Sequence, residues 1–396
     1  MSGLQSQSPS TTGEQQFKND FALALYGLLR ERQGNLFFSP FSIRTALGMA
    51  CAGARGETAL EMNRTLGFAA SDETLHTAVA ALLERLNTAG AGLYEMAVAN
   101  SLWSQDGAPL RAEFLDLVAR HYTGAMNPVD FQRDPESART LINRWVEDKT
   151  KQKVRNLIPQ NGISAQTRLV LANAVSFKGL WELPFDELAT RDQPFHLEGG
   201  REVSAPLMQH HARVRYMQAE GYQAVDLDYR GGDLSMLVIL PDRKLQLRDF
   251  EESVSVGMLE SCMAQLIKRV VEISLPRFKM AWALELKPHL SSLGMPLAFS
   301  RFRADFSGIN GHAPPHEDSL LISAVFHKAF VEVNEEGTEA AAATAVVMEA
   351  MMGMGRSMPP RPPTFRADHP FLFAIRDRKS GAILFLGRMA DPTQAS

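Results

Sequence analysis

Three observations predict a mixed α+β fold in a single domain. Apolar residues recur at helical spacing through most of the first 150 residues. Beyond residue 165 the chain consists largely of short runs rich in β-branched and aromatic residues. No linker separates the two parts, because Gly and Pro occur singly at turns and cluster only at 351–363, close to the C-terminus.

Composition supports a globular chain. The 396 residues are 45% hydrophobic and 22% charged, which allows a large core and excludes disorder and collagen-like structure. Lys plus Arg number 41 against 45 Asp plus Glu, a net charge of −4 without a long run of one sign, so we expect neither a nucleic-acid nor a membrane partner. The two cysteines, Cys51 and Cys262, cannot form a disulfide scaffold for a chain of this length.

Four helices are predicted in the N-terminal part. The first spans about 17–32, with Phe17, Phe21, Leu25 and Leu28 on one stripe. A second follows the Ser39-Pro40 turn, and segments 72–87 and 135–150 add two helices with polar outer faces. The strand-like runs that follow lie at 167–177, 202–210, 214–218, 222–229, 234–240, 269–280, 329–334 and 371–375.

One segment does not fit a core. Residues 335–364, EEGTEAAAATAVVMEAMMGMGRSMPPRPPT, connect two predicted strands, and a connection of this length inside a compact domain is usually functional or disordered. The even positions at 338–348 are small or apolar, and no Pro occurs before Pro359. The segment could therefore become a strand inside a sheet, although its alanines equally suit a surface helix or tether.

Several motifs in register resemble the serpins, and the loop closely resembles that of inhibitory members. They are NLFFSPFSIRTALGMACAGARGET (35–58), INRWVEDKT (142–150), LANAVSFKGLWELPFD (171–186), SMLVILP (235–241), FHKAFVEVNEEGTEA (326–340) and FRADHPFLFAIRD (365–377). The likeness covers about 17–392, and one departure is Gln152, where glycine is often found. The polar residues at the N-terminus predict a disordered tail at 1–16, and the resemblance implies one serpin domain at 17–393.

That resemblance also implies about nine helices packed on three β-sheets, with the exposed reactive centre loop at about 335–364. In such proteins a protease cleaves the loop, the N-terminal part inserts into the central sheet, and the acyl-enzyme is trapped; this insertion is a known property of serpins. The chain is then a suicide-substrate inhibitor of serine endopeptidases, with cysteine endopeptidases as a further class, and not an enzyme. The hinge of the loop would comprise Glu335, Glu336, Gly337, Thr338, Glu339, Ala340, Ala341, Ala342 and Ala343.

The resemblance assigns two further groups. Ser39, Ser42, Asn173 and His327 would lie beneath the central sheet where it opens, as a hydrogen-bonded cluster that controls strand separation. A catalytic Ser42–His327 pair is the less favoured interpretation, because FSPFS does not resemble a nucleophile elbow. Trp181 and an Arg277–Glu335 ion pair would mark the point where the loop enters the sheet.

The scissile bond has two candidates. Counting from the hinge glycine selects Met351–Met352, whereas counting back from the distal GRSMPPRPPTF, which is antithrombin-like, selects Arg356–Ser357. The loop is about five residues longer than usual, so cleavage after Arg356 would leave a slack tether and favour turnover. We therefore favour Met351 for chymotrypsin, elastase or subtilisin-like targets, and keep Arg356, for trypsin-like targets, as the alternative.

Other partners and cofactors are not expected. The histidines have no metal-ligand spacing, no phosphate-binding glycine loop occurs, and the nearly neutral 71–87 segment predicts no heparin binding. We expect a monomer, with loop–sheet polymers on heating left open. No signal peptide is recognisable, which indicates the cytoplasm, whereas the family resemblance indicates the extracellular space. The remaining functional alternative is a non-inhibitory serpin that acts as a carrier or chaperone.

Overall fold

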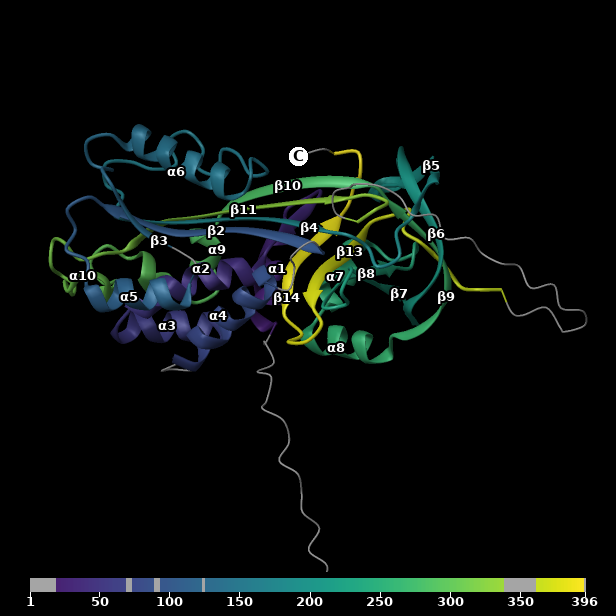
Figure 1. Ribbon diagram of the computed structural model, residues 1–396, viewed down its shortest axis with the longest axis horizontal. Coiled ribbons are helices and arrows are strands. Elements are labelled where there is room, and N and C mark those ends of the chain that lie inside the picture. Colours follow the sequence, from purple (N-terminus) through teal and green to yellow (C-terminus); the bar gives the residue numbers. More distant parts are fainter. Residues whose placement is uncertain (1–18, 69–72, 89–92, 123–124, 338–360, 395–396) are drawn as a thin grey trace, which may run out of the picture.

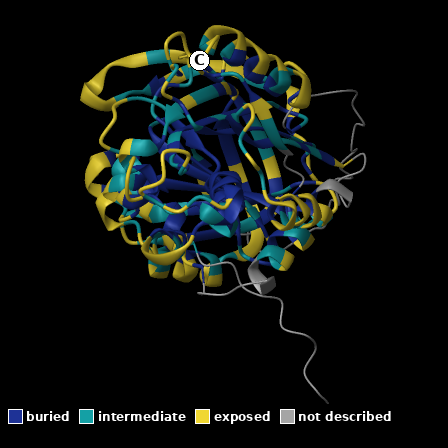
Figure 2. Ribbon diagram, turned by 90° about the vertical axis from the view of Figure 1, so that its left-hand side faces the viewer, coloured by how far each residue is buried: buried dark blue, intermediate teal, exposed yellow. Residues whose placement is uncertain are grey.

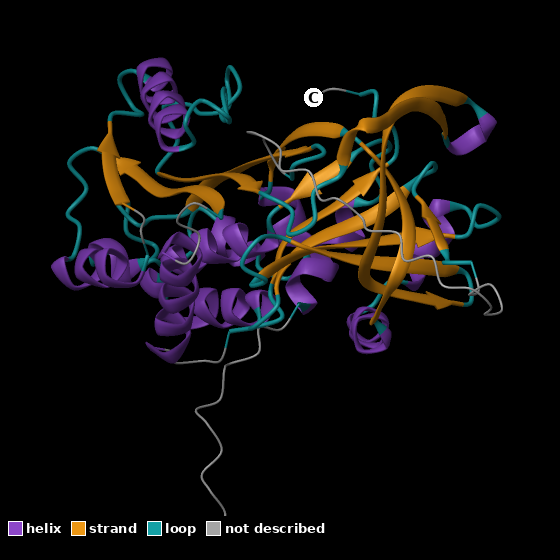
Figure 3. Cartoon of the chain, turned by 45° about the vertical axis from the view of Figure 1, so that its right-hand side comes forward, coloured by secondary structure: helices purple, strands orange, loops and turns teal. Residues whose placement is uncertain are grey.

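The computed structural model describes residues 19–68, 73–88, 93–122, 125–337 and 361–394. A five-stranded sheet extends across the molecule, with one helix on its outer face and several helices on its inner face (Figure 1). The remaining strands form a second, larger sheet, which is conspicuous in Figure 3. The structure confirms the predicted mixed α+β fold.

Ten α-helices and two short 3-10 helices occur in the described residues. The α-helices are α1 (Asp20–Leu29), α2 (Pro40–Gly53), α3 (Gly56–Leu66), α4 (Glu73–Thr88), α5 (Ala112–His121), α6 (Pro135–Lys149), α7 (Leu247–Ser253), α8 (Val256–Gln265), α9 (Lys287–Ser292) and α10 (Ser307–Asn310). The 3-10 helices are η1 (Glu198–Gly200) and η2 (Pro296–Phe299).

The five-stranded sheet has the order β10-β11-β4-β2-β3. Its strands are β2 (Tyr94–Gln105), β3 (Ala125–Val129), β4 (Leu169–Gly179), β10 (Phe278–Glu285) and β11 (Ile322–Val333). Strands β11 and β4 pair in parallel, whereas β10 is antiparallel to β11 and β2 is antiparallel to β4. Two long strands at the centre of the sheet therefore end at the same edge; we call this pair the β4–β11 seam.

The second sheet has the order β1-β14-β13-β8-β7-β6-β9-β12, and β5 also pairs with β6. Its strands are β1 (Leu36–Phe38), β5 (Asp186–His196), β6 (Glu202–Ala219), β7 (Tyr222–Asp228), β8 (Leu234–Pro241), β9 (Ile267–Pro276), β12 (Thr364–Arg366), β13 (Phe371–Asp377) and β14 (Ile383–Met389). Where three sheets were expected, the described strands are linked into two, because β6 is 18 residues long and pairs successively with β5, β9 and β7.

Strand β2 lies in a region that the sequence predicted to be mostly helical. Its sequence, YEMAVANSLWSQ, contains residues common in helices, but most of its side chains are buried against the sheet's two faces. Tertiary burial therefore overrides the local preference for a helix.

Both faces of the five-stranded sheet are covered. Helix α6 packs on the outer face through Ile142 and Val146, which join Ala99 and Trp103 of β2 in one apolar cluster. Helix α2 contacts the opposite face at β2 and β4. As Figure 2 shows, buried residues fill the space between the layers and exposed ones lie on the outer surfaces.

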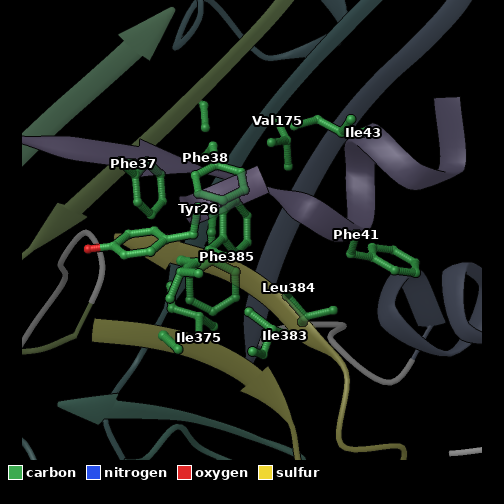
Figure 4. Packing of buried hydrophobic residues seen from close by; sticks show 14 of the residues in the cluster. Tyr26, Phe37, Phe38, Phe41, Ile43, Val175, Ile375, Ile383, Leu384 and Phe385 are labelled. Carbon is green, nitrogen blue, oxygen red and sulfur yellow. The ribbon is translucent and has the colours of Figure 1, made fainter. Parts of the chain in front are cut away.

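Aromatic rings dominate the larger core between the two sheets (Figure 4). Phe37 stacks on Phe385 with ring centroids 5.4 Å apart and on Phe373 at 5.8 Å. All three rings are almost fully buried. This stacking joins β1, β13 and β14.

Among the described residues, no helix is long and apolar enough to cross a membrane.

Replacing Phe37 by alanine should destabilise the protein by about 3–5 kcal/mol, because it removes a fully buried ring and leaves a cavity. Urea unfolding of the purified variant would measure the change. Phe302→Ala is the matched control: the Phe302 ring is 64% exposed, and its loss should change stability by less than about 1 kcal/mol. Equal losses in the two variants would contradict this account of the core.

Candidate functional site

A buried polar cluster lies at the centre of the β4–β11 seam. It contains the four residues that the family resemblance placed beneath the sheet and one more: Ser39, Ser42, Asn100, Asn173 and His327. Strand register explains their meeting, because Asn173 of β4 lies opposite His327 of β11 on one side and Asn100 of β2 on the other. Three adjacent strands thus present one polar side chain each at the same level.

Helix α2 supplies the two serines. Ser39 is the N-cap of this helix: its Oγ accepts the N–H of Ser42 at 3.1 Å, and Pro40 occupies the first turn. The FSPFS motif is therefore a helix start. The Ser39 hydroxyl also donates to the Leu384 carbonyl of β14 at 2.6 Å, and this bond ties the cluster to the second sheet.

The hydrogen bonds define the state of His327. Its Nε2 accepts the backbone N–H of Ser39 at 3.2 Å, so the ring proton is on Nδ1, which donates to the Asn173 side-chain oxygen. The Asn173 amide nitrogen donates to the Ser42 hydroxyl at 2.5 Å and to the Asn100 side-chain oxygen. Burial lowers the pKa of His327 to about 3, so the imidazole is neutral at physiological pH.

This arrangement does not resemble a catalytic site. His327 bonds to the backbone nitrogen of Ser39 and to Asn173, and the Ser42 hydroxyl pairs with asparagine side chains. The cluster is closed to solvent and joins α2, β2, β4, β11 and β14. It therefore fixes the spacing of the strands, and a substrate has no access to it.

The chain turns back sharply after β11. Asn334 and Gly337 pair through both backbone groups, at 2.8 Å and 3.2 Å, and form a tight four-residue turn. Gly337 lies directly on the end of β4: a Cβ there would be 2.1 Å from the Gly179 carbonyl oxygen. With a φ of +144°, this position requires glycine. Gly337 therefore lies at the end of the seam where β4 and β11 finish, which we call the upper end.

Trp181 and Glu335 hold this turn in place. The Trp181 indole N–H donates to the Asn334 carbonyl at 3.0 Å, and the Trp181 backbone N–H donates to the Glu336 backbone carbonyl at 2.8 Å. The indole also stacks on Tyr229 at 4.5 Å. Glu335 accepts hydrogen bonds from Arg277 at 2.5 Å and from Thr190 at 2.6 Å.

The predicted Arg277–Glu335 pair is present and is asymmetric in exposure. The Glu335 side chain is 4% exposed, whereas that of Arg277 is 48% exposed. Burial alone would raise the pKa of Glu335, but the bonds from Arg277 and Thr190 outweigh burial and hold the pKa below its ordinary value. Glu335 is therefore an ionised anchor.

Sequence reasoning missed Asn100, Thr190, Tyr229 and Asn334. Asn100 was detectable as a polar residue within an apolar stretch, whereas the other three depend on tertiary contacts.

The remaining predicted hinge residues, Thr338, Glu339, Ala340, Ala341, Ala342 and Ala343, lie outside the described residues. So do both candidate reactive bonds, Met351–Met352 and Arg356–Ser357. No group of His, Cys, Asp or Glu side chains that could hold a metal ion occurs within the described ranges.

The neutral His327 should make stability depend on pH. An unfolded histidine titrates near pH 6.5, so between about pH 6.5 and 3 the unfolded chain binds a proton that the native chain excludes. The stabilising contribution is complete above about 6.5 and decreases as pH falls, by about 1.4 kcal/mol per pH unit. We expect His327→Gln to reduce this slope in urea unfolding between pH 6 and 4.5. His211→Gln, on an exposed site of β6, should keep the wild-type slope, and an unchanged slope in His327→Gln would refute the assignment.

Comparison with known proteins identifies the family. The family model for serpin (serine protease inhibitor) matches residues 16–392. An uncharacterized serpin-like protein of Thermococcus kodakarensis is 39% identical over 94% of this chain and 84% of its own length. Leukocyte elastase inhibitor A of Rattus norvegicus is 37% identical, over 94% and 97% of the two chains. The structure of human thyroxine-binding globulin with thyroxine superposes with a TM-score of 0.83 at 30% identity, covering 95% of this chain and 97% of the other. This chain therefore belongs to the serpin family.

Proposed function

We propose that this protein is an inhibitory serpin, a suicide substrate that traps serine endopeptidases by inserting its cleaved loop between β4 and β11. One observation carries the proposal. In the described structure, the chain leaves β11 through a tight turn, and this turn places Gly337 at the upper end of the seam. A segment that continues from Gly337 begins at the point where a new strand would have to start.

Strand direction favours such an insertion. A strand that enters the seam from this end would run antiparallel to both β4 and β11. One parallel ladder would be replaced by two antiparallel ones, and antiparallel pairing is slightly more stable per residue. The inserted segment would also satisfy its own backbone groups on both sides. The native fold, with the seam closed, would then be the less stable arrangement.

Residue size supports the same proposal. The alternate positions Thr338, Ala340, Ala342, Thr344 and Val346 are small or of moderate volume. Side chains of this kind can pass between strands and pack beneath them without requiring a large cavity. A charged or bulky residue at one of these positions would oppose insertion.

The length of the seam favours cleavage after Met351. Strands β4 and β11 are 11 and 12 residues long, so a full partner strand needs about 12 residues, or roughly 40 Å. Cleavage after Met351 leaves 14 residues beyond Gly337, and cleavage after Arg356 leaves 19. The shorter segment holds an attached protease close to the far end of the sheet, whereas the longer one leaves several residues of slack.

The chemistry of trapping is then as follows. The protease serine Oγ attacks the Met351 carbonyl carbon, the Met351–Met352 C–N bond breaks, and the amine of residue 352 leaves with the proton from the serine. The resulting ester links the protease to Met351. If insertion displaces the protease before water reaches that ester, the complex persists. Elastase-type enzymes are suitable targets because a relative is named a leukocyte elastase inhibitor.

The alternative is a serpin that carries a ligand and does not trap proteases. Its support is the structural likeness to human thyroxine-binding globulin, which was solved with thyroxine bound. The small residues at the start of the loop favour the inhibitor, because a carrier has no need of a segment able to insert.

Incubation of the protein with chymotrypsin, elastase or subtilisin should give a complex that survives denaturing electrophoresis, and a released peptide that starts at Met352. Met351→Asp should abolish trapping by these enzymes, because it removes the apolar residue they accept. Met358→Asp is the matched control and should trap normally. Efficient trapping of trypsin with a peptide that starts at Ser357 would instead select Arg356. Cleavage by every enzyme without any stable complex would contradict the inhibitor proposal.

A second test addresses insertion itself. Thr344→Arg places a long charged side chain at an inward position of the inserted strand, and burying that charge would cost several kcal/mol. We expect the variant to be cleaved at the same bond but to release active protease, so that residual protease activity reports turnover. Ala345→Arg, on the outward side, should still inhibit, and equal loss of inhibition in both variants would contradict the proposed alternation.

A further inference from the structure

A hollow of about 400 Å³ lies at the opposite end of the seam from the turn at Gly337. It opens where β4 and β11 begin, beside the segment that precedes β4 and the start of α9. The strand pairing is irregular here: the register shifts between Ile322 and Ala324, so Ser323 has no partner across the ladder. Ser323 of β11 and Arg168, which immediately precedes β4, both line the hollow beside this irregularity.

The lining of the hollow is strongly cationic although the whole chain carries a net charge of −4. Arg168, Lys287 and Arg301 contribute positive charges, and Glu317 is the only carboxylate among the lining residues. Within the part of the chain that the structure describes, none of the three cations forms an ion pair. Three cations and one carboxylate around one concavity leave an excess of positive charge, which creates a local positive potential.

Hydrogen-bond donors remain unused in the same place. Arg168 donates from Nη1 to the carbonyls of Ala165 and Thr167 at 3.1 Å and 3.0 Å, which fixes the guanidinium and leaves its other N–H groups available. The Lys287 Nζ makes a long contact of 3.5 Å to the Ser323 carbonyl and lies 6.0 Å from the centroid of the Phe299 ring. An ammonium group has three protons, so Lys287 can donate further.

Two hydroxyls add to this set. Thr167 Oγ1 accepts the backbone N–H of Ser164 at 3.0 Å, and Ser323 Oγ accepts that of Arg168 at 2.9 Å. Because both oxygens act as acceptors, each hydroxyl keeps its proton as a donor for a ligand. The hollow thus combines fixed guanidinium, ammonium and hydroxyl donors, the groups that bind tetrahedral oxyanions.

An aromatic ring lies at the rim. Phe302 is 64% exposed, and the guanidinium of its neighbour Arg301 lies over the ring at 5.4 Å. Arg301 is therefore partly ordered by its own neighbour, and the outer face of Phe302 is open to a flat apolar group.

From this arrangement we infer that the hollow binds an oligophosphate chain, either free or as part of a nucleotide. Three separated cations match an anion with several charges along a chain better than a single phosphate. The ligand would contact Arg168 at the start of β4 and Lys287, which adjoins the start of β11. The site uses no residue of the loop, so it is independent of the proposed inhibitory function.

The test is calorimetric titration of the full-length protein with sodium tripolyphosphate, in buffer adjusted to constant ionic strength. We expect saturable binding at one site per chain. The double variant Lys287→Gln, Arg301→Gln should bind at least about tenfold more weakly, since it removes two charged contacts. The charge-matched control Lys244→Gln, Lys268→Gln changes two exposed lysines remote from the hollow and should bind as the wild type does.

A parallel titration with ATP distinguishes the two sources of the ligand. Equal affinities for ATP and tripolyphosphate would mean that the chain of phosphates alone is recognised. If ATP binds more tightly than tripolyphosphate and Phe302→Ala removes this difference, the base stacks on the Phe302 ring at the rim. The inference is overturned if the wild type shows no saturable binding, or if both double variants lose affinity equally. Binding is measured without a protease, so its failure leaves the inhibitor proposal untouched.

Discussion

The structure depends on a parallel pair of strands that a buried polar cluster holds together at its centre. His327 and Asn173 lie opposite each other on β11 and β4, and both are sealed from water. A neutral imidazole that accepts from Ser39 and donates to Asn173 satisfies its hydrogen bonds only while the strands keep their spacing. The closed seam is held both by this cluster and by the parallel ladder between β4 and β11, so an incoming strand must replace both sets of bonds.

The two ends of the seam differ in chemistry. At the upper end, Trp181 and the ionised Glu335 hold a turn that directs the chain back over β4. At the opposite end, where β4 and β11 begin, Arg168, Lys287 and Arg301 line a hollow beside the register shift at Ser323; we call this the lower end. If a strand inserts from above, as proposed, a ligand at the lower end would adjoin the far end of that strand.

Sequence patterns predicted the α+β class, most strands of the second half, and the four helices α1, α2, α4 and α6, but not α3, α5, α7, α8, α9 or α10. They failed at β2, because Ala, Glu and Met favour a helix locally and only packing on both faces of a sheet makes this segment a strand. The same failure hid the role of Asn100, which follows from its position opposite Asn173 on the neighbouring strand. Family resemblance supplied Ser39, Ser42, Asn173 and His327, and the structure brings them together; Thr190 and Tyr229 depend on contacts between distant segments that periodicity cannot report.

Thermal unfolding of the intact and the loop-cleaved protein tests the central claim most directly. If the closed seam is the less stable arrangement, the cleaved chain gains a strand of about 12 residues and should melt more than about 10 °C higher, as several kcal/mol of added stability implies. An equal or lower melting temperature after cleavage would show that no strand enters the seam, and would contradict the account.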